Sequence, residues 1–276
     1  MGRHGGGVSI CLKLTFAGFF AGRVQQEARF FPMLYRLLAC CLCVSAFLAC
    51  SPEERNLRNY YFPAEQLRGG MVYEYLSEQG DSVVTEYWYY RSFLRDSGLF
   101  LAGTYYDEHF RIGQIVREKM AESGAVAREY FLYDSDAPDG RQRQIPTVLR
   151  SGQVFPFAVR DSAAVSLFDL SYSPPDEPGT TLRVLRERRF LGNAPDFVFR
   201  GGKVRCVRFS LRETIGGDDE AGPPLEGRGE EHYALGLGRV YYRKSYGSGE
   251  AVQFEYRLHD VFPMAELERR AGVGSE

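Results

Sequence analysis

The stretch EAVQFEYRLH, Glu250–His259, alternates apolar and polar residues along its length. A period of two is typical of a β-strand, because successive side chains of an extended chain point to opposite faces. The stretch therefore predicts a strand with one buried and one solvated face. Its predicted apolar face consists of Val252, Phe254, Tyr256 and Leu258.

The same signal recurs along the chain, so the predicted fold is mainly β. Segments with alternating, β-branched or aromatic residues favour strands, and the short Gly-, Asp- and Ser-containing gaps between them favour hairpins. We therefore expect a single antiparallel curved sheet or incomplete barrel with one or two short helices. The further predicted strands are Met71–Glu78, Ser82–Arg91, Leu99–Glu108, Val126–Tyr133, Lys203–Glu213 and His232–Lys244.

Few segments favour a helix. Arg160–Leu170 is one candidate, and Pro263–Ala271 is the other, because proline suits the first turn of a helix. Thr181–Leu191 fits a helix and a strand equally well. The Pro, Gly and acid content of two further segments is typical of surface loops. These predicted loops are Ser173–Gly179 and Gly216–Glu230.

The charge of the chain is close to balanced, with 34 Lys and Arg against 36 Asp and Glu among 276 residues. Residues 1–49 contain five basic residues and the single acid Glu27, so the remainder is mildly acidic. Binding to nucleic acid requires clustered cations, and nucleic acid is therefore excluded as a predicted partner. The basic run Arg183–Arg189 is expected to be a solvated face.

An apolar run, Leu37–Ala49, follows a short basic sequence that begins at Met33. The run is too short for a membrane-spanning helix, which needs ~20 residues, but it has the build of a secretory signal. We predict a lipoprotein signal peptide over residues 33–49 and translation from Met33. Residues 1–32 then lie upstream of the true start.

The end of this run, Phe47-Leu48-Ala49-Cys50, resembles a bacterial lipobox, in which a peptidase cuts before a lipid-modified cysteine. It departs from the usual pattern at Phe47, where leucine is commonest, and at Leu48, where a small residue is commoner. The resemblance implies lipidation of Cys50. The polar residues that follow predict a lipid-anchored tether over residues 50–70, and the alternating segments predict a β-rich domain over residues 71–276. An ordinary signal peptide and a buried helix are the alternatives.

The histidines and acids show no metal-site spacing. Three histidines have acidic neighbours but fall on separate predicted strands, without HxH or HExxH spacing, so we expect them to face solvent. The acids of Asp134–Gly140 do not match the EF-hand loop, and a hairpin turn is the simpler interpretation. The three histidines are His109, His232 and His259.

Other motifs do not indicate an enzyme. Gly236-Leu237-Gly238 lies within a predicted strand, where it favours a bulge or bend over a nucleotide site. Cys206 is placed on the more polar face of its strand and has no adjacent histidine. A metal site at Cys40, Cys41 and Cys43 is disfavoured because they lie inside the predicted signal peptide. We therefore predict no catalytic residue, no metal and no cofactor.

The sequence YWYY, Tyr87–Tyr90, places aromatic side chains on both faces of one predicted strand. Such a strand is either buried on both faces or lines a cavity with one of them. Aromatic residues of neighbouring strands extend this face, which predicts a site for a hydrophobic or glycan ligand. The alternative is that the rings only fill the core. The residues of the predicted ligand site are Trp88, Tyr90, Tyr106 and Tyr242.

Two phrases of the chain resemble β-rich envelope lipoproteins of Gram-negative bacteria, including a TapB-like group. They are YFPAEQLRGGMVYEY, Tyr61–Tyr75, and EHYALGLGRVYY, Glu231–Tyr242, with Ala64 where leucine is usual. The resemblance implies an envelope location and a sheet fold, without an assigned reaction. LolA-like lipid carriers share the curved-sheet architecture, which is an analogy of fold alone.

Three functional hypotheses follow from these features. The first is a non-enzymatic lipoprotein, anchored to the outer membrane through its N-terminal lipid, that acts as a binding or structural subunit and contacts an envelope protein. The second is a carrier or sensor of a hydrophobic or glycan ligand on the aromatic face. The third is an envelope hydrolase. The first predicts a packed concave face, and the second predicts an open apolar one.

Overall fold

The computed structural model describes residues 54–79, 82–134, 142–160, 164–177, 179–217, 223–247 and 252–272. All of these residues belong to the unit Pro52–Glu276. The predicted signal peptide, Cys50 and most of the Asp134–Gly140 turn therefore lie outside the described residues.

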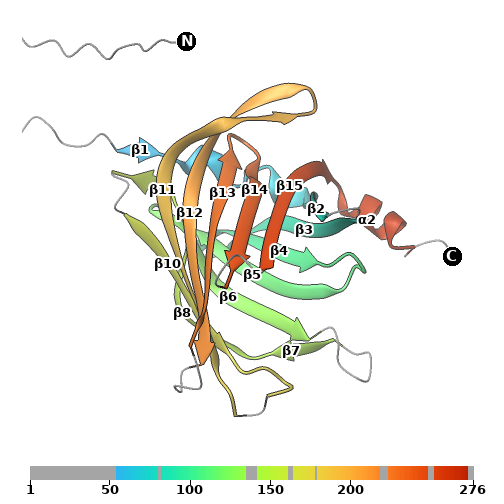
Figure 1. Ribbon diagram of the computed structural model, residues 1–276. Helices are drawn as coiled ribbons and strands as arrows, with labels where there is room; N and C mark the ends of the chain where they lie inside the picture. The colour runs from blue at the N-terminus through green and yellow to red at the C-terminus, as the bar shows by residue number, and fades with distance from the viewer. Residues whose placement is uncertain are drawn as a thin grey trace, which may run out of the picture. The chain divides into compact units, whose positions relative to one another are not determined.

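The described chain is mostly β-strand (Figure 1). Two short 3-10 helices, η1 (Arg58–Tyr60) and η2 (Leu67–Gly69), precede the long strands, and one α-helix, α2 (Met264–Arg270), follows them. The strands are β1 (Arg55–Asn56), β2 (Met71–Gln79), β3 (Ser82–Arg95), β4 (Gly98–Tyr106), β5 (Ile112–Met120), β6 (Gly124–Asp134), β7 (Arg143–Ile145), β8 (Thr147–Pro156), β9 (Ala158–Val159), β10 (Val165–Tyr172), β11 (Leu182–Phe199), β12 (Gly202–Gly217), β13 (Leu225–Ala234), β14 (Gly238–Tyr246) and β15 (Val252–Phe262).

The long strands form a closed antiparallel barrel. Within the described residues, twelve strands pair in the order β2-β3-β4-β5-β6-β8-β10-β11-β12-β13-β14-β15, and β15 pairs with β2 to complete the ring. β7 adds to the edge of β6, and β1 pairs with β9 in a separate small sheet.

The prediction of an open curved sheet or incomplete barrel is therefore wrong, although the mainly β, antiparallel character is confirmed. The β5–β6 pairing, with Val116 opposite Tyr130, joins the two edges that an open sheet would leave free. Alternation in the sequence indicates which face of a strand is buried, but it does not indicate whether the outermost strands pair with each other.

The core fills the barrel interior. In β12 the predicted face of Val207, Phe209 and Leu211 is buried, while Arg208 and Arg212 are exposed. Tyr256 and Leu258 of β15 are buried as expected, but Val252 and Phe254 on the same face are exposed at the start of the strand. The alternation therefore identifies the face correctly and does not show where along the strand the core ends.

Several local predictions are wrong. The predicted helix Arg160–Leu170 overlaps strand β10, which pairs on both sides with β8 and β11. The predicted single strand His232–Lys244 is a hairpin, because Gly236 and Gly238 have φ of 75° and 90° and make the turn between β13 and β14. Thr181–Leu191 lies in strand β11, and strand β13 begins inside the predicted Gly216–Glu230 loop.

Two elements pack on the ends and the outside of the barrel. The long β11–β12 hairpin curls over at the top of Figure 1. Arg200 at its tip donates to Asp260 Oδ1 (2.8 Å) and to the Val261 carbonyl (2.7 Å). The predicted C-terminal helix is confirmed as α2, whose Leu267 packs in a cluster with Val72, Tyr87 and Phe262.

Candidate functional site

A short N-terminal segment closes one end of the barrel. We call residues Leu57–Leu67 the plug, because most of its apolar side chains are buried in the core. The Leu57 amide donates to the Phe157 carbonyl (2.8 Å), and the Gly236 amide donates to the Asn59 carbonyl (2.8 Å). The segment predicted as a tether is therefore fixed to the barrel from Leu57 onward. The buried plug residues are Leu57, Tyr61, Phe62, Ala64 and Leu67.

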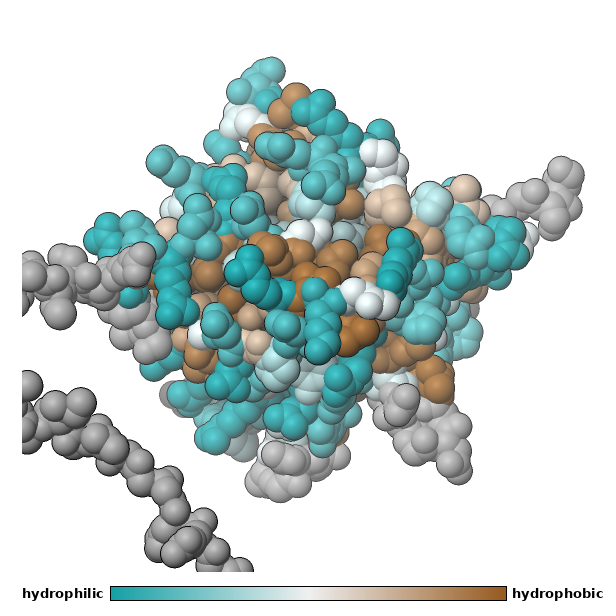
Figure 2. Space-filling model, turned by 90° about the horizontal axis from the view of Figure 1, so that it is seen from above, coloured by the Kyte–Doolittle hydropathy of each residue, from teal (hydrophilic) through white to brown (hydrophobic). Residues whose placement is uncertain are grey.

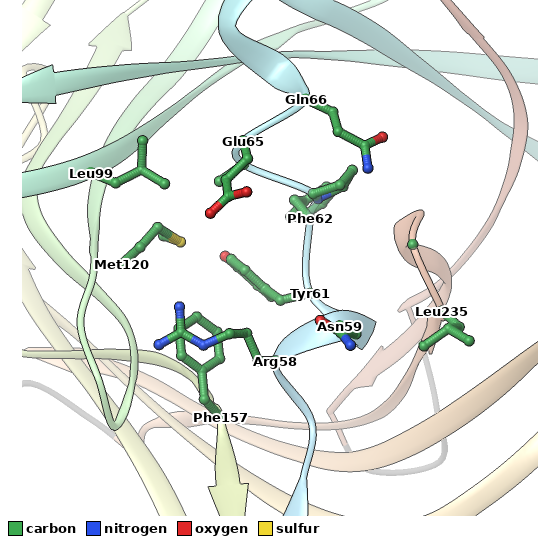
Figure 3. A pocket seen from close by; sticks show the side chains of 13 residues that line it. Arg58, Asn59, Tyr61, Phe62, Glu65, Gln66, Leu99, Met120, Phe157 and Leu235 are labelled. Atoms are coloured by element: carbon green, nitrogen blue, oxygen red, sulfur yellow. The ribbon is translucent and has the colours of Figure 1, made fainter.

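A pocket of about 450 Å³ lies between the plug and the barrel rim, and we call it the mouth pocket. In Figure 3, Leu99 and Met120 lie on one side of it and Leu235 on the other, with Tyr61 of the plug between them. Phe157 forms part of the floor. Seen from above, hydrophobic residues gather near the middle of the molecule and hydrophilic residues surround them (Figure 2).

Polar groups of the plug complete the mouth pocket. Arg58 stacks its guanidinium 4.3 Å from the centre of the Phe157 ring and donates to the Ala121 carbonyl (3.0 Å), so it is held in place. Asn59, Glu65 and Gln66 are exposed and line the same pocket. Apolar walls with a few polar groups at the rim are typical of small-molecule binding sites of this size.

The structure places three of the four predicted ligand-site residues inside the barrel. Trp88 and Tyr90 of β3 and Tyr242 of β14 belong to or pack against the main core cluster. Tyr106 instead packs against the outer cluster beneath α2 and pairs with Tyr87 across β3 and β4. Its neighbour Tyr105 is opposite Trp88 and 5.4 Å from it, ring centre to ring centre.

These inner rings are packed against the plug and against each other. Measured between ring centres, Phe62 lies 4.0 Å from Tyr90, and Trp88 stacks on Tyr90 at 5.9 Å. Tyr242 stacks on Tyr256 with their ring centres 5.2 Å apart. A cavity of about 70 Å³ remains beside Trp88 and Tyr90. The aromatic face is therefore mainly packed core in this structure.

Charged residues inside the barrel were missed by the sequence analysis. Arg188 and Glu231 are almost completely buried and form a two-point ion pair, with Nε–Oε2 at 2.5 Å and Nη2–Oε1 at 3.2 Å. Burial raises the pKa of Glu231, but the charges of Arg188 and Arg239 outweigh it and hold the pKa well below its usual range. Glu231 is two residues from the buried Tyr233 and therefore lies on the same face of its strand. This position on an apolar face is the feature of the sequence that could have indicated a buried charge.

Two other buried carboxyl groups, those of Glu118 and Glu86, have raised pKa values. Burial raises the pKa of Glu118 to about 7, although the Tyr61 hydroxyl donates to it and opposes the shift. Burial also raises the pKa of Glu86, which accepts a hydrogen bond from Trp88 Nε1 (3.1 Å). Glu86 alternates with Trp88 and Tyr90 along β3. Glu118 alternates with Val116 and Met120 along β5, so apolar neighbours were again the available signal.

A second charged cluster centres on Glu213. Arg186 and the Tyr246 hydroxyl donate to its carboxylate, and Lys244 Nζ lies 3.4 Å from Oε1. Burial raises the pKa of Glu213, but Arg186 and Lys244 outweigh it and lower the pKa to about 2. Burial lowers the pKa of Lys244 to about 8. The cluster is a paired ionic network.

The remaining sequence candidates do not come together. His109 and His259 are exposed, and His232 is half-buried against Tyr241. Cys206 is buried, contrary to the predicted polar position, because β12 is covered on both sides there. Among the described residues no group of three His, Cys, Asp or Glu side chains has metal-binding geometry. No helix of the described chain is long and apolar enough to cross a membrane.

No protein family model matches the chain, and no curated protein matches its sequence. A solved structure of a candidate lipoprotein from Parabacteroides distasonis is 13% identical, with a TM-score of 0.46 over 73% of this chain and 97% of that one. A candidate exported protein with a YmcC-like fold from Bacteroides fragilis is also 13% identical, with a TM-score of 0.42 over 73% and 98%. Likenesses this distant do not indicate what the chain binds, and the TapB-like and LolA-like resemblance stays a prediction.

Proposed function

We propose that the protein is a non-enzymatic binding protein of the bacterial cell envelope, anchored to the outer membrane by lipid at Cys50, with the mouth pocket as its binding site. The observation that carries this proposal is the mouth pocket itself. Its volume of about 450 Å³ falls within the range of ligand sites, and its walls combine apolar and polar groups.

The anchor and the pocket are close in the chain. Four residues separate Cys50 from Arg55 in β1, which pairs with Val159 of β9. The five residue steps from Cys50 to Arg55 span at most roughly 18 Å, at ~3.3–3.6 Å per residue. Lipidation of Cys50 would therefore keep the plug end of the barrel near the membrane surface, where the partner is a membrane component or a segment of another envelope protein.

The packed interior supports the partner-binding hypothesis over a ligand carrier that uses the aromatic face. Trp88, Tyr90 and Tyr242 are in contact with other rings, and the remaining cavity of about 70 Å³ is too small for an acyl chain or a sugar. A ligand-carrier function is favoured only at the mouth pocket, so both functions are tested there.

The anchor is tested with Cys50→Ala in the native organism. The wild-type protein should fractionate with membranes and incorporate an alkyne-labelled fatty acid, and Cys50→Ala should do neither. Cys206→Ala is the matched control, because this buried thiol is far along the chain and should not affect either property. A Cys50→Ala protein that remains labelled and membrane-bound would contradict the anchor.

The mouth pocket is tested by filling it. Met120→Trp places a larger side chain in the pocket, and Val83→Trp is the control, because Val83 is 61% exposed and lies near the other end of β3. Native mass spectra of the unit from Ser51 onward should show a bound mass, or crosslinking in the envelope should show a partner, for the wild type and Val83→Trp. Equal binding by Met120→Trp would contradict the pocket's role.

A further inference from the structure

Several arginines of this protein bind a carboxylate with the edge formed by Nε and Nη2. Arg188 binds Glu231 in this way, and Arg183 binds Asp169 at 2.9 and 2.7 Å. Arg269 does the same with Glu266, at 2.8 and 2.6 Å. The two N–H groups of this edge match the two oxygens of a carboxylate, which makes the pair strong and well oriented.

Arg239 of β14 is an exception inside the barrel. Its Nε and Nη2 atoms are buried and have no hydrogen-bond partner among the described residues. In the described part of the chain, Arg239 forms an ion pair through Nη1, which lies 3.9 Å from Glu231 Oε1, beyond hydrogen-bond distance. Both Glu231 oxygens already accept from Arg188. The carboxylate-binding edge of Arg239 is therefore unpaired.

Aromatic rings hold this guanidinium but do not pair with its edge. Its central carbon lies 4.4 Å from the ring centre of Tyr242, 5.3 Å from Trp88 and 5.4 Å from Tyr75. Ring faces attract the cation, whereas its in-plane N–H groups still require oxygen acceptors. The Tyr75 hydroxyl donates to the Arg239 carbonyl (2.7 Å), and neither Nε nor Nη2 has an acceptor among the described residues.

The cavity beside Arg239 has the charge and size for an anion. Three arginines line it, Arg186, Arg188 and Arg239. The lining contains a single carboxyl group among the described residues, that of Glu118. The volume of about 70 Å³ exceeds the space that one water molecule needs and suits a carboxylate group. Arg188 and Arg186 are paired with Glu231 and Glu213, so the attraction for an anionic occupant comes mainly from Arg239.

We infer that this internal cavity is a binding site for a carboxylate, held by the Nε–Nη2 edge of Arg239. Binding requires the guanidinium to turn within its ring cage so that the edge meets the cavity. Tyr61 and Phe62 of the plug line both this cavity and the mouth pocket. A carboxylate can therefore arrive as a small free anion or as the head of a ligand whose tail occupies the mouth pocket.

The position of Trp88 provides a direct measurement, since it is the single tryptophan of the chain and lies against Arg239. Acetate or octanoate is titrated into the purified full chain at constant ionic strength, in exchange for chloride, while Trp88 emission is recorded. We expect a saturable change with at least one of them. Arg239→Met and Arg239→Lys should weaken binding at least tenfold, because neither keeps the two-point edge.

Arg243→Met is the matched control, because Arg243 is an exposed arginine on the same strand, and it should bind as the wild type does. Arg239→Lys keeps a cation under the rings, so it serves if Arg239→Met does not fold. A response to acetate supports a free small anion, and a response to octanoate alone supports the head of a longer ligand. No saturable response, an unchanged response in both Arg239 variants, or an equal response to phosphate would overturn the inference.

Discussion

The Tyr61 hydroxyl donates a hydrogen bond to Glu118 Oε2, and this contact joins the plug to the inner wall of the barrel at β5. Tyr61 also packs against Phe155 and Tyr233, at ring distances of 4.8 and 6.2 Å. The bond satisfies a carboxyl group that is buried in the core, with Glu118 only 5% exposed. This hydrogen bond therefore couples the position of the plug to the ionisation of a carboxyl group inside the barrel.

Tyr61→Phe should destabilise the protein by about 1–3 kcal/mol, because it removes a hydrogen bond to a buried and partly ionised carboxyl group. The loss should be larger at pH 8 than at pH 5, since Glu118 carries more charge at pH 8. Urea denaturation at both pH values measures the effect. Tyr60→Phe removes a hydroxyl from the neighbouring half-buried residue and is the control. Equal losses for both variants would contradict a specific role for the Tyr61–Glu118 bond.

Glu118→Gln should change how stability depends on pH. The pKa of Glu118 is about 7 in the folded chain, against an ordinary value of 4.5, so the folded state holds this proton more tightly. The free energy of unfolding of the wild type therefore falls as pH rises from about 4.5 to about 7, by an amount on the order of 3 kcal/mol for this group. Glutamine does not titrate, so most of this fall should disappear.

The measurement is the free energy of unfolding of the wild type and Glu118→Gln at several pH values between 4 and 8. Some decrease should persist in the variant, because the pKa of the buried Glu86 is raised as well. Glu122→Gln, at an exposed position just beyond β5, should follow the wild-type curve. A variant with an unchanged slope would show that Glu118 does not titrate in this range.

The strands were predictable because each has a face that must be buried. Val207, Phe209 and Leu211 alternate with polar residues, and this pattern places β12 correctly. The turn at Gly236 and Gly238 was missed because glycine is compatible with a bulge and with a hairpin turn, and only the pairing of β13 with β14 decides between them. Barrel closure depends likewise on pairing between β5 and β6 and between β15 and β2.

The candidate site was less predictable than the fold. Trp88, Tyr90 and Tyr242 were expected to share a face and do so, but the plug that covers them was assigned to a tether. Its polar composition suggests a linker, and only the buried positions of Tyr61 and Phe62 reveal its role. The interior charges were missed because single charged residues on apolar faces are tolerable only with partners such as Arg188 and Glu231, which are 43 residues apart.

Arg188→Met should destabilise the protein by roughly 3–5 kcal/mol, because it leaves the Glu231 carboxylate buried without its main partner. The double variant Arg188→Met, Glu231→Leu should recover most of this loss, since no uncompensated charge remains in that pair. Arg212→Met removes one member of an exposed pair, Arg212–Glu226 at 3.7 Å, and should cost less than about 1 kcal/mol. Denaturation of all variants at pH 7 completes the comparison. A double variant less stable than Arg188→Met would contradict the argument.

Gly238→Ala should release the plug from the barrel rim. Gly238 has φ of 90°, and an added Cβ would lie 2.4 Å from Phe62 Cδ1, so the Phe62 ring must move. Gly236→Ala is a matched control in the same turn, because its φ is 75° but nothing lies within 4 Å of an added Cβ. Both variants should lose about 1–2 kcal/mol from backbone strain.

The additional loss in Gly238→Ala measures the contact between the plug and the β13–β14 turn. Since Phe62 lies 4.0 Å from Tyr90, and Tyr90 stacks on Trp88, displacement of Phe62 should shift Trp88 emission in Gly238→Ala and leave it unchanged in Gly236→Ala. Limited proteolysis should also cut the Gly238→Ala chain faster between Leu57 and Leu67. Identical stability, emission and cleavage in the two variants would mean that the Phe62–Gly238 contact does not hold the plug in place.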